Sequence, residues 1–263
     1  MKLSFVLVAR LFAALALLAS GAAQAADVRV MISAGFYHAY HEMSPAFEKA
    51  SGQKLVTIRG PSLGDSPEAI PNRLKRGEAV DVVIMVGASI DDLMGQGLVR
   101  PGSKVDLARS QIGMVVRSGA AKPDIVSVDA FRQVLLGAKS VAYSDSASGI
   151  YLSTTLFEKL GVAGQVMPKS RKIKGPPSGE PVAAVVARGD AEIGFQQVSE
   201  LLNVPGVTFV GPIPASLQQD TFFSAGLGAK VSNADGAAAL MKFLASSEAA
   251  PYMTQAGLGP LAK

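Results

Sequence analysis

The sequence predicts an α/β protein with two similar units, on three observations. Short apolar strands are followed repeatedly by segments with helical spacing, a pattern typical of parallel sheets covered by helices. The alternation restarts near Val126, and no low-complexity linker separates the two parts. The chain of 263 residues is long enough to bury one or two hydrophobic cores. We therefore expect two α/β lobes.

The first unit opens with an apolar strand from Val28 to Ser33 and a helix from about Phe36 to Ser51, which we expect to end at Gly52. Residues 66–68, Ser-Pro-Glu, combine an N-cap, a first-turn proline and an acidic residue, so they predict a helix start. The remaining elements are expected as strands at 55–59, 80–86 and 112–116, a loop at 60–64 and a short helix at 90–94.

The second unit continues the same alternation. Its elements are expected as helices at 128–136, 151–160 and 182–188, strands at 140–143 and 192–195, and a Gly/Pro/Ser-rich loop at 174–181. The chain then closes with strands at 208–210 and 222–227 and helices at 234–246 and 249–255. Because the switch between units has strand character, we expect hinge strands near 108–116 and 212–226. The expected division is a first lobe of residues 26–110 plus 214–263 and a second lobe of residues 111–213.

Residues 1–25 have the features of a secretory signal peptide. A basic start is followed by an apolar run from Leu11 to Leu18 and by Ala23-Gln24-Ala25, a small-residue cleavage signal. We therefore expect an exported protein. After residue 25 no stretch approaches the roughly 20 apolar residues that a spanning helix needs. We expect no membrane insertion once the signal is removed.

The composition narrows the chemistry. The chain has no cysteine, which excludes disulfides, thiolate nucleophiles and thiolate metal sites. Lys and Arg number 25 against 21 Asp and Glu, a formal charge of +4, but the basic residues are scattered and aromatic residues are few. Because no basic stripe with stacking residues is present, we expect no nucleic-acid partner. A small anionic ligand fits this composition better.

The segment from Val141 to Tyr151 is the most informative part of the chain. An apolar strand runs into small hydroxyl residues and Gly149, and then directly into a helix. Unpaired backbone N–H groups and the helix dipole attract carboxylates and oxyanions at such a helix start. Ser146 and Ser148 are therefore candidate ligand contacts, with a simple N-cap of the helix as the alternative for either serine.

Three further strand-to-helix junctions offer similar groups. In open α/β sheets a ligand lies beyond the carboxyl ends of the strands, where such junctions gather. They are residues 33–36, 60–66 and 196–197, which present small residues, backbone amides or side-chain amides. The candidate substrate-binding residues from these four junctions are Ser33, Gly35, Ser62, Ser146, Ser148, Gly149 and Gln197.

Two arginines stand at the edges of apolar strands. Arg59 and Arg109 could each direct a guanidinium fork at a carboxylate, and Arg109, with Ser110 beside it, falls at the expected crossover between lobes. The alternative for both arginines is a solvated surface position. We take Arg59, Arg109 and Ser110 as candidate substrate-binding residues.

The two histidines of the chain, His38 and His41, cluster with Tyr37 at the start of the first long helix. A histidine there could act as a general base near neutral pH, and a solvated helix face is the alternative. No third ligand is evident, so we expect no zinc site. The sequence also lacks the Gly-x-Ser-x-Gly, phosphate-loop and His-Glu-x-x-His motifs. Neither a metal nor another cofactor is expected.

An ordered set of short motifs gives the sequence a family resemblance. The set comprises the signal peptide, the Ser-Ala-Gly loop at 33–35, the helix end at 47–52, the strand at 81–84, and the segments at 148–151 and 192–194. In this order the chain resembles the periplasmic molybdate-binding-like branch of bacterial solute-binding proteins, across essentially the whole mature sequence. The resemblance implies a type II periplasmic-binding-protein fold, with the ligand cleft between two α/β lobes joined by hinge strands. It also implies a periplasmic monomer that closes on a small anion.

The chain departs from the molybdate binders of this branch at several positions. Gly35 stands where they have a ligand serine, with Ser33 two positions earlier, and Gln197 stands where they have a ligand tyrosine. The loop at 60–66 is enlarged. Together with Arg109 and Ser110, these changes favour a larger ligand with carboxylates over a compact tetrahedral oxyanion.

Within this branch the chain also resembles periplasmic isomerases that interconvert trans- and cis-aconitate by a 1,3-proton shift. That reaction needs acid or base groups and fixed positive charge, but no cofactor. The resemblance implies a cofactor-independent isomerase of a tricarboxylate, for which His38 and Tyr37 are the proton-transfer candidates. The alternatives are a receptor that delivers a molybdate-like oxyanion or a carboxylate to an ABC-transporter permease, and a sensor that binds the anion without a transporter.

Overall fold

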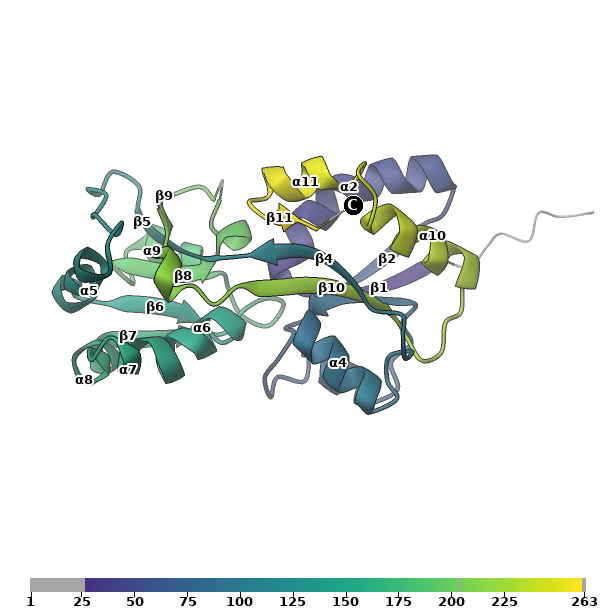
Figure 1. Cartoon of the computed structure of the whole chain (residues 1–263), viewed down its shortest axis with the longest axis horizontal. Helices are drawn as coiled ribbons and strands as arrows, with labels where there is room; N and C mark the ends of the chain where they lie inside the picture. The colour runs from purple at the N-terminus through teal and green to yellow at the C-terminus, as the bar shows by residue number, and fades with distance from the viewer. Residues whose placement is uncertain (1–26, 203, 262–263) are drawn as a thin grey trace, which may run out of the picture.

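The computed structural model describes residues 27–202 and 204–261, which form two lobes side by side along the long axis of the molecule (Figure 1). The predicted signal peptide, residues 1–25, lies outside the described residues. Among the described helices, none is both long and apolar enough to cross a membrane.

The first lobe contains a six-stranded mixed sheet with the strand order β11-β4-β10-β3-β1-β2. Its strands are β1 (Val28–Ile32), β2 (Leu55–Arg59), β3 (Val82–Val86), β4 (Val105–Ser110), β10 (Thr221–Leu227) and β11 (Gly259–Pro260). β1 is parallel to β2 and β3, whereas β10 is antiparallel to β3 and β4. The helices of this lobe are α2 (Ala34–Ser51), α3 (Ile70–Lys75), α4 (Gly87–Gly95), α10 (Ala234–Leu244) and α11 (Ala250–Gln255).

The second lobe contains a five-stranded sheet with the order β7-β6-β8-β5-β9. Its strands are β5 (Ile112–Arg117), β6 (Val141–Ser144), β7 (Ser170–Ile173), β8 (Ile193–Gln197) and β9 (Val207–Pro212). Its helices are α5 (Val128–Gly137), α6 (Ala147–Tyr151), α7 (Phe157–Lys159), α8 (Ala163–Val166) and α9 (Val182–Arg188), with a π-helical segment at Leu152–Leu156 and 3-10 turns at Met167–Lys169 and Val198–Glu200. A further 3-10 turn at Ala215–Leu217 lies in the connection from β9 of this sheet to β10 of the other.

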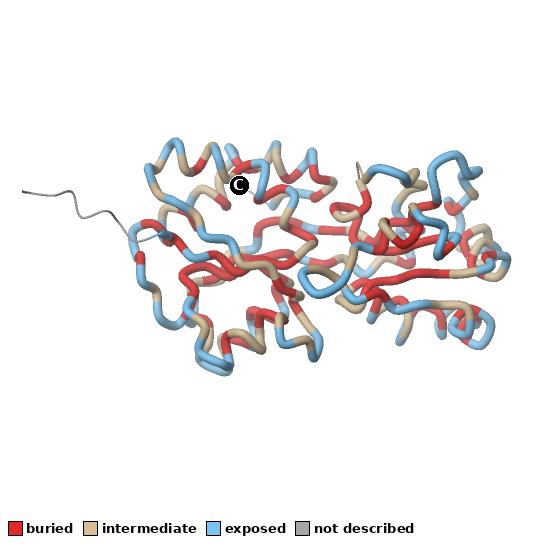
Figure 2. Tube along the Cα trace, turned by 180° about the vertical axis from the view of Figure 1, so that it is seen from behind, coloured by how far each residue is buried: buried red, intermediate tan, exposed pale blue. Residues whose placement is uncertain are grey.

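Hydrophobic clusters cover both faces of each sheet. In β1, Val30 and Ile32 join one buried cluster with residues of α2, while Met31 between them joins another with Ile70 of α3. This division follows from the pleat, since successive side chains of a strand point to opposite faces. Figure 2 shows that the central strands of both lobes are largely buried. The two sheets therefore form rigid platforms for the loops that follow their strands.

Several predicted elements differ from those observed. The helix expected from Ser66 begins only at Ile70, because Ser66 turns back to donate a hydrogen bond to the carboxylate of Glu68. The helix expected at 151–160 starts earlier, at Ala147. The first half of β4 and the whole of β7 were missed, because β4 begins with a charged residue between apolar ones and β7 has two basic residues at its centre, patterns that favour a surface loop as readily as a strand.

The connection between the lobes is short at the crossover. β4 ends at Ser110 and β5 begins at Ile112, so a single residue separates strands of the two sheets. Gln218 supports this crossover, since its side-chain amide accepts from the Ile112 N–H (2.9 Å) and donates to the Ile112 and Ile213 carbonyls (2.9 and 3.1 Å). We propose the lobe boundaries expected from the sequence, residues 26–110 with 214–263 and residues 111–213, because the two sheets separate at this point.

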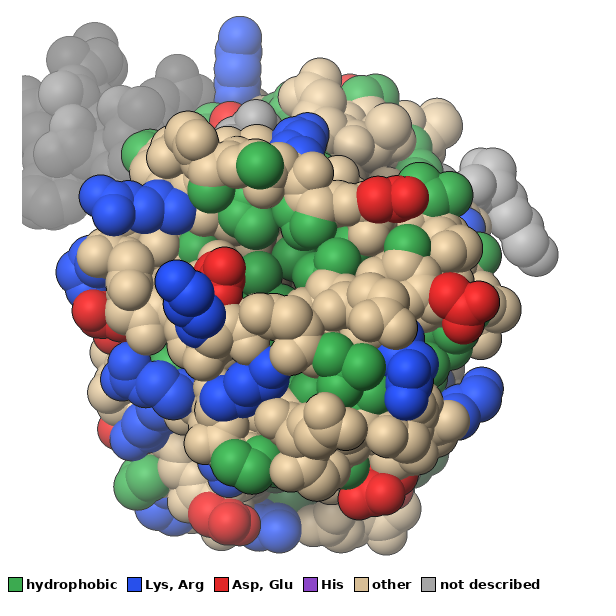
Figure 3. Space-filling model, turned by 90° about the vertical axis from the view of Figure 1, so that its left-hand side faces the viewer, with side chains coloured by type: hydrophobic (Ala, Val, Ile, Leu, Met, Phe, Trp, Pro, Cys, Tyr) green, Lys and Arg blue, Asp and Glu red, His purple; other side chains and the backbone are tan. Residues whose placement is uncertain are grey.

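The surface of the second lobe mixes charges of both signs. Figure 3 shows Lys and Arg side chains on the end of this lobe, interspersed with Asp, Glu and uncharged groups. Arg188, for example, pairs with Glu180 at 2.6 Å and with Asp190 at 3.0 Å. The positive charge of this lobe is therefore partly compensated locally.

Candidate functional site

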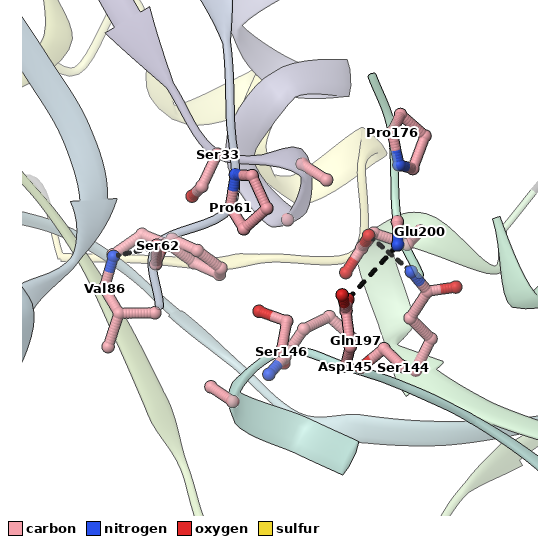
Figure 4. Close-up of a pocket in the computed structure, with 16 residues that line it drawn as sticks. Ser33, Pro61, Ser62, Val86, Ser144, Asp145, Ser146, Pro176, Gln197 and Glu200 are labelled. Atoms are coloured by element: carbon pink, nitrogen blue, oxygen red, sulfur yellow. Dashed lines mark hydrogen bonds between the residues drawn. The ribbon is translucent and has the colours of Figure 1, made fainter. Parts of the chain in front are cut away.

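A cavity lies between the two lobes (Figure 4). The first lobe lines it with residues 33–35, 61–62, 86 and 223, and the second lobe with residues 144–147, 175–176, 196–197 and 200. Most of these residues follow the carboxyl ends of β1, β2, β3, β6, β7 and β8, where an open α/β sheet binds its ligands.

The first lobe presents two serine hydroxyls to the cavity. Ser33 is the N-cap of α2 but makes no side-chain cap bond, and its buried Oγ has no hydrogen-bond partner among the described residues. The Oγ of the buried Ser62 accepts the N–H of Val86 at 3.1 Å, so its own proton is available to a ligand. A Cβ atom at Gly35 would lie 2.3 Å from Cζ of Phe223, so the first turn of α2 requires glycine there.

The second lobe contributes the loop between β6 and α6. Ser146 is the N-cap of α6 without a side-chain cap bond, and it lines the cavity. Ser148 does not line this cavity, and its Oγ is paired with the Oγ of Ser144 at 3.0 Å; it lines a neighbouring hollow between the lobes that shares Val86 and Ala147 with the cavity. Gly149 also lies outside the wall, and a Cβ atom there would be 1.7 Å from the carbonyl oxygen of Ser144. Of the three candidate residues in this segment, Ser146 lines the cavity, as expected from the sequence. Ser148 and Gly149 shape the segment behind it.

Two further polar side chains of the second lobe face the cavity. The buried Gln197 donates from Nε2 to Oγ1 of Thr221 at 2.9 Å, while its Oε1 has no partner within the described part of the chain. Asp145 accepts the N–H of Gly175 at Oδ1, at 3.2 Å. These contacts fix both side chains at the carboxyl end of their strands.

Glu200 is a partly buried carboxyl group in the same wall, on the 3-10 turn after β8. Its Oε1 accepts a 2.6 Å hydrogen bond from Nε2 of Gln196, and Oε1 of Gln196 accepts the N–H of Val182 at 3.2 Å. Burial raises the pKa of Glu200 to about 7, although the Gln196 hydrogen bond and the charge of Arg59 lower it. Glu200 is thus a carboxyl group that changes protonation near neutral pH.

A second hollow adjoins the cavity, and the two share Ala34, Pro176 and Glu200 in their walls. Tyr37, His38 and Arg59 line this hollow and not the central cavity. The guanidinium carbon of Arg59 lies 4.0 Å from the centroid of the Tyr37 ring, and the buried Nε of Arg59 lacks a hydrogen-bond partner among the residues described.

His38 is exposed on the outer side of α2. Tyr37 stacks on His41, with 5.6 Å between ring centroids. Within residues 27–202 and 204–261, no cluster of three or more His, Asp or Glu side chains is placed to hold a metal ion.

Arg109 and Ser110 are not brought to the cavity. Arg109 lies on the exposed side of β4 and pairs with Asp220 at 3.3 Å. Ser110 points to the buried side, as the alternation of a strand requires, and lies at the crossover between lobes. Arg109 therefore does not line the cavity in this structure, because the strand directs its side chain to solvent.

Sequence reasoning missed Asp145, Gln196 and Glu200 as individual site residues. Gln196 and Asp145 lay in junctions already predicted to face a ligand. Glu200 follows Gln197 closely and is the only charged residue in the sequence from Ile193 to Leu202. An isolated carboxyl group so close to a predicted strand-to-helix junction is a signal that could have identified it.

The chain is similar to several known proteins. It is 49% identical to an aconitate isomerase from a Pseudomonas species over 232 residues, which cover 88% of this chain and 87% of that protein. It is 26% identical to the molybdate-binding protein ModA of Azotobacter vinelandii over 205 residues, covering 70% and 74% of the two chains. The solved periplasmic molybdate-binding protein of Azotobacter vinelandii superposes with a TM-score of 0.70 at 19% identity, covering 88% of this chain and 98% of that one.

These similarities confirm the predicted fold and family. Two α/β lobes with a cavity between them are the type II periplasmic-binding-protein architecture, which the solved molybdate-binding protein shares. The family model described as bacterial extracellular solute-binding protein matches residues 28–259, almost the whole described region. The chain therefore belongs to the family of bacterial extracellular solute-binding proteins.

Proposed function

We propose that this protein is a periplasmic isomerase that interconverts trans- and cis-aconitate by a 1,3-proton shift. The observation that carries the proposal is the 49% identity to an aconitate isomerase across 88% of the chain. The periplasmic location rests on the extracellular family and on the signal-like residues 1–25. Because the reaction moves one proton and one double bond, it needs no cofactor.

The cavity offers hydrogen-bond donors to an anion from both lobes. The hydroxyl groups of Ser33, Ser62 and Ser146 line the cavity and donate no hydrogen bond to another described residue. The first N–H groups of the 18-residue helix α2 add unpaired donors and the positive end of the helix dipole. We propose that these groups hold two carboxylates of the substrate between the lobes.

Gln197 can complement them. Its side-chain amide can turn by 180° without a change of shape, because the Thr221 hydroxyl can donate to an oxygen as well as accept from a nitrogen. In that orientation the amide NH₂ group faces the cavity and donates to a carboxylate. We propose this orientation for the complex with substrate.

The chemistry follows from the acidity of the methylene group beside the double bond. Removal of a methylene proton gives an allylic anion whose charge spreads onto the adjacent carboxylates. Donors that already contact those carboxylates then stabilise the charge as it develops. Return of a proton to the other end of the allylic system completes the isomerisation, with no oxidation or reduction.

The proposal is tested by incubating the purified mature protein with trans-aconitate in deuterated water and following the products by NMR. We expect cis-aconitate to form, and deuterium in its methylene group measures how far the transferred proton exchanges with water. Tight binding of trans-aconitate without conversion or deuterium uptake would instead favour the second candidate, a receptor for an ABC-transporter permease, which the family itself supports.

A further inference from the structure

We infer that Glu200 is the catalytic residue that removes the methylene proton of the substrate and returns it to the other end of the allylic system. This inference rests on the isomerase proposal and assigns the proton transfer to a group outside the histidine and tyrosine pair expected from the sequence.

The position of Glu200 suits this role. It lies in the wall of the central cavity, close to Pro176 and Gln197, and comes from the second lobe (Figure 4). The unpartnered hydroxyl of Ser33 comes from the first lobe. A tricarboxylate held by the serine hydroxyls therefore has Glu200 in the wall of the same cavity.

The surroundings of Glu200 hold its carboxyl group in place. The hydrogen bond from Gln196 leaves its second oxygen, Oε2, free of any hydrogen bond among the described residues. Gln196 is itself fixed by the N–H of Val182 at the start of α9. One oxygen is thus anchored and the other is available to the substrate.

The charges around Glu200 make its proton affinity suitable for transfer in both directions. Arg59 approaches from the end of β2 and favours the carboxylate, while Asp145, in the loop after β6, favours the neutral acid. Burial is the largest cause, and with Asp145 it outweighs Arg59 and the Gln196 hydrogen bond and brings the pKa of Glu200 to about 7. Because such a group is partly ionised at neutral pH, it can accept a carbon-bound proton and release it again.

Asp145, the other carboxyl group of the cavity wall within the described residues, is held by the Gly175 N–H and serves as a negative charge that raises the pKa of Glu200. His38 is less well placed, because it is exposed and lines the adjoining hollow but not the cavity.

The step balances with this one residue. The Glu200 carboxylate forms an O–H bond as the methylene C–H bond breaks, and the released electron pair becomes the new double bond. The electrons of the former double bond move to its distal carbon, which takes the proton back from Glu200. The carboxylate is regenerated, and no other reactant is consumed.

The deciding experiment compares Glu200→Gln with the wild type in the NMR assay and by calorimetry with trans-aconitate. The substitution keeps the side-chain shape and an oxygen for the Gln196 hydrogen bond, so the fold is preserved. We expect turnover to fall at least about a hundredfold, within the range for general acid–base catalysis. The affinity for trans-aconitate should stay the same or increase, because a negative charge is removed. Glu158→Gln, at an exposed carboxyl group of α7 in the same lobe, is the matched control and should behave like the wild type.

A pH profile separates catalysis from a structural role. In the wild type, kcat/KM should fall below about pH 7 as Glu200 becomes protonated. Arg59→Met removes the charge that favours the carboxylate, so the acid limb should move to higher pH. A structural defect would lower activity at all pH values without moving that limb.

The outcomes are distinguishable. Turnover in Glu200→Gln within fivefold of the wild type would overturn the assignment and leave the isomerase proposal intact. If turnover is instead lost in His38→Ala, proton transfer belongs to the histidine expected from the sequence. A wild type with neither conversion nor deuterium uptake would overturn the isomerase proposal, and this assignment with it.

Discussion

At the scale of single residues, the candidate site depends on polar groups that the fold leaves without partners. Ser33 and Gln197 each keep a buried polar atom unpaired among the described residues, and both atoms belong to side chains that line the cavity. A buried polar group without a partner costs free energy, so a folded protein retains one where a ligand can satisfy it. We therefore expect Ser33 and Gln197 to contribute to ligand binding.

Removing the hydroxyl of Ser33 should weaken binding of trans-aconitate. We expect Ser33→Ala to cost about 1.5–3 kcal/mol of binding free energy, the usual range for a hydrogen bond to a charged group. Calorimetry measures this directly. Ser44→Ala, on the same helix but bonded to the Tyr40 carbonyl, is the matched control, and equal affinities in the two variants would contradict the role of Ser33.

The raised pKa of Glu200 should also make the free energy of unfolding depend on pH. Its pKa is about 7 in the folded protein and 4.5 for an ordinary glutamate, so between these values the folded chain binds the proton more tightly than the unfolded chain. Its contribution to stability therefore decreases as the pH rises through that window. In Glu200→Gln this decrease is absent.

We expect the free energy of unfolding of Glu200→Gln, relative to the wild type, to increase by up to about 3 kcal/mol between pH 5 and pH 8. Urea unfolding of both proteins at the two pH values measures the difference. A difference that does not change with pH would show that the folded environment leaves the Glu200 carboxyl group unperturbed.

At the scale of elements, the crossover from β4 to β5 positions one lobe against the other. Because a single residue joins the two strands, Gln218 supplies hydrogen bonds to the backbone groups beside it, in addition to the bond from the Ile213 N–H to the Ile112 carbonyl. The side-chain amide of Gln218 serves three of them, on Ile112 and Ile213. The Gln218 side chain therefore acts as a brace, because its hydrogen bonds hold the backbone of the two hinge segments together.

Gln218→Leu should therefore destabilise the protein. Each buried backbone group left unpaired costs about 1–3 kcal/mol, less where water can reach it. We expect a clear loss of thermal stability, measured by circular dichroism. The neighbouring exposed residue provides the control: if Gln219→Leu lowers the melting temperature as much, the brace is not specific to Gln218.

At the scale of the whole molecule, the two lobes touch each other around the cavity. Ser199 of the second lobe donates to the carbonyl of Gly35 in the first lobe at 2.6 Å, and Ser178 donates to Glu68 at 3.2 Å. Both bonds depend on the lobes being close together. They join segments that lie far apart in the sequence but flank the same cavity.

Loss of the Ser199 contact should favour separation of the lobes. We expect Ser199→Ala to weaken the binding of trans-aconitate by about five- to tenfold, since one hydrogen bond contributes about 1 kcal/mol. Small-angle scattering should show a larger radius of gyration for the ligand-free variant than for the wild type. Unchanged affinity and radius would mean that this bond makes no contribution to closure.

The local sequence determined the fold class and much of the cavity. Alternating apolar strands and helical segments predicted both sheets, and the helix end at Gly52 was confirmed because the residue adopts a φ of 70°, which glycine accommodates readily. Ser33, Ser62, Ser146 and Gln197 were predicted to face a ligand, and all four line the cavity. They were accessible to prediction because each follows the carboxyl end of a strand, a position that the neighbouring residues define.

Only the tertiary structure decided which charged groups share that space. The pKa of Glu200 depends on burial and on Gln196, Arg59 and Asp145, which come from different elements. Arg109 had the right residue type, but the pleat of β4 and the position of Asp220 direct it to the surface. Periodicity in the sequence specifies which face of its own element a residue occupies. Contact with other elements depends on how the lobes pack, and that packing places Glu200 beside the proposed substrate.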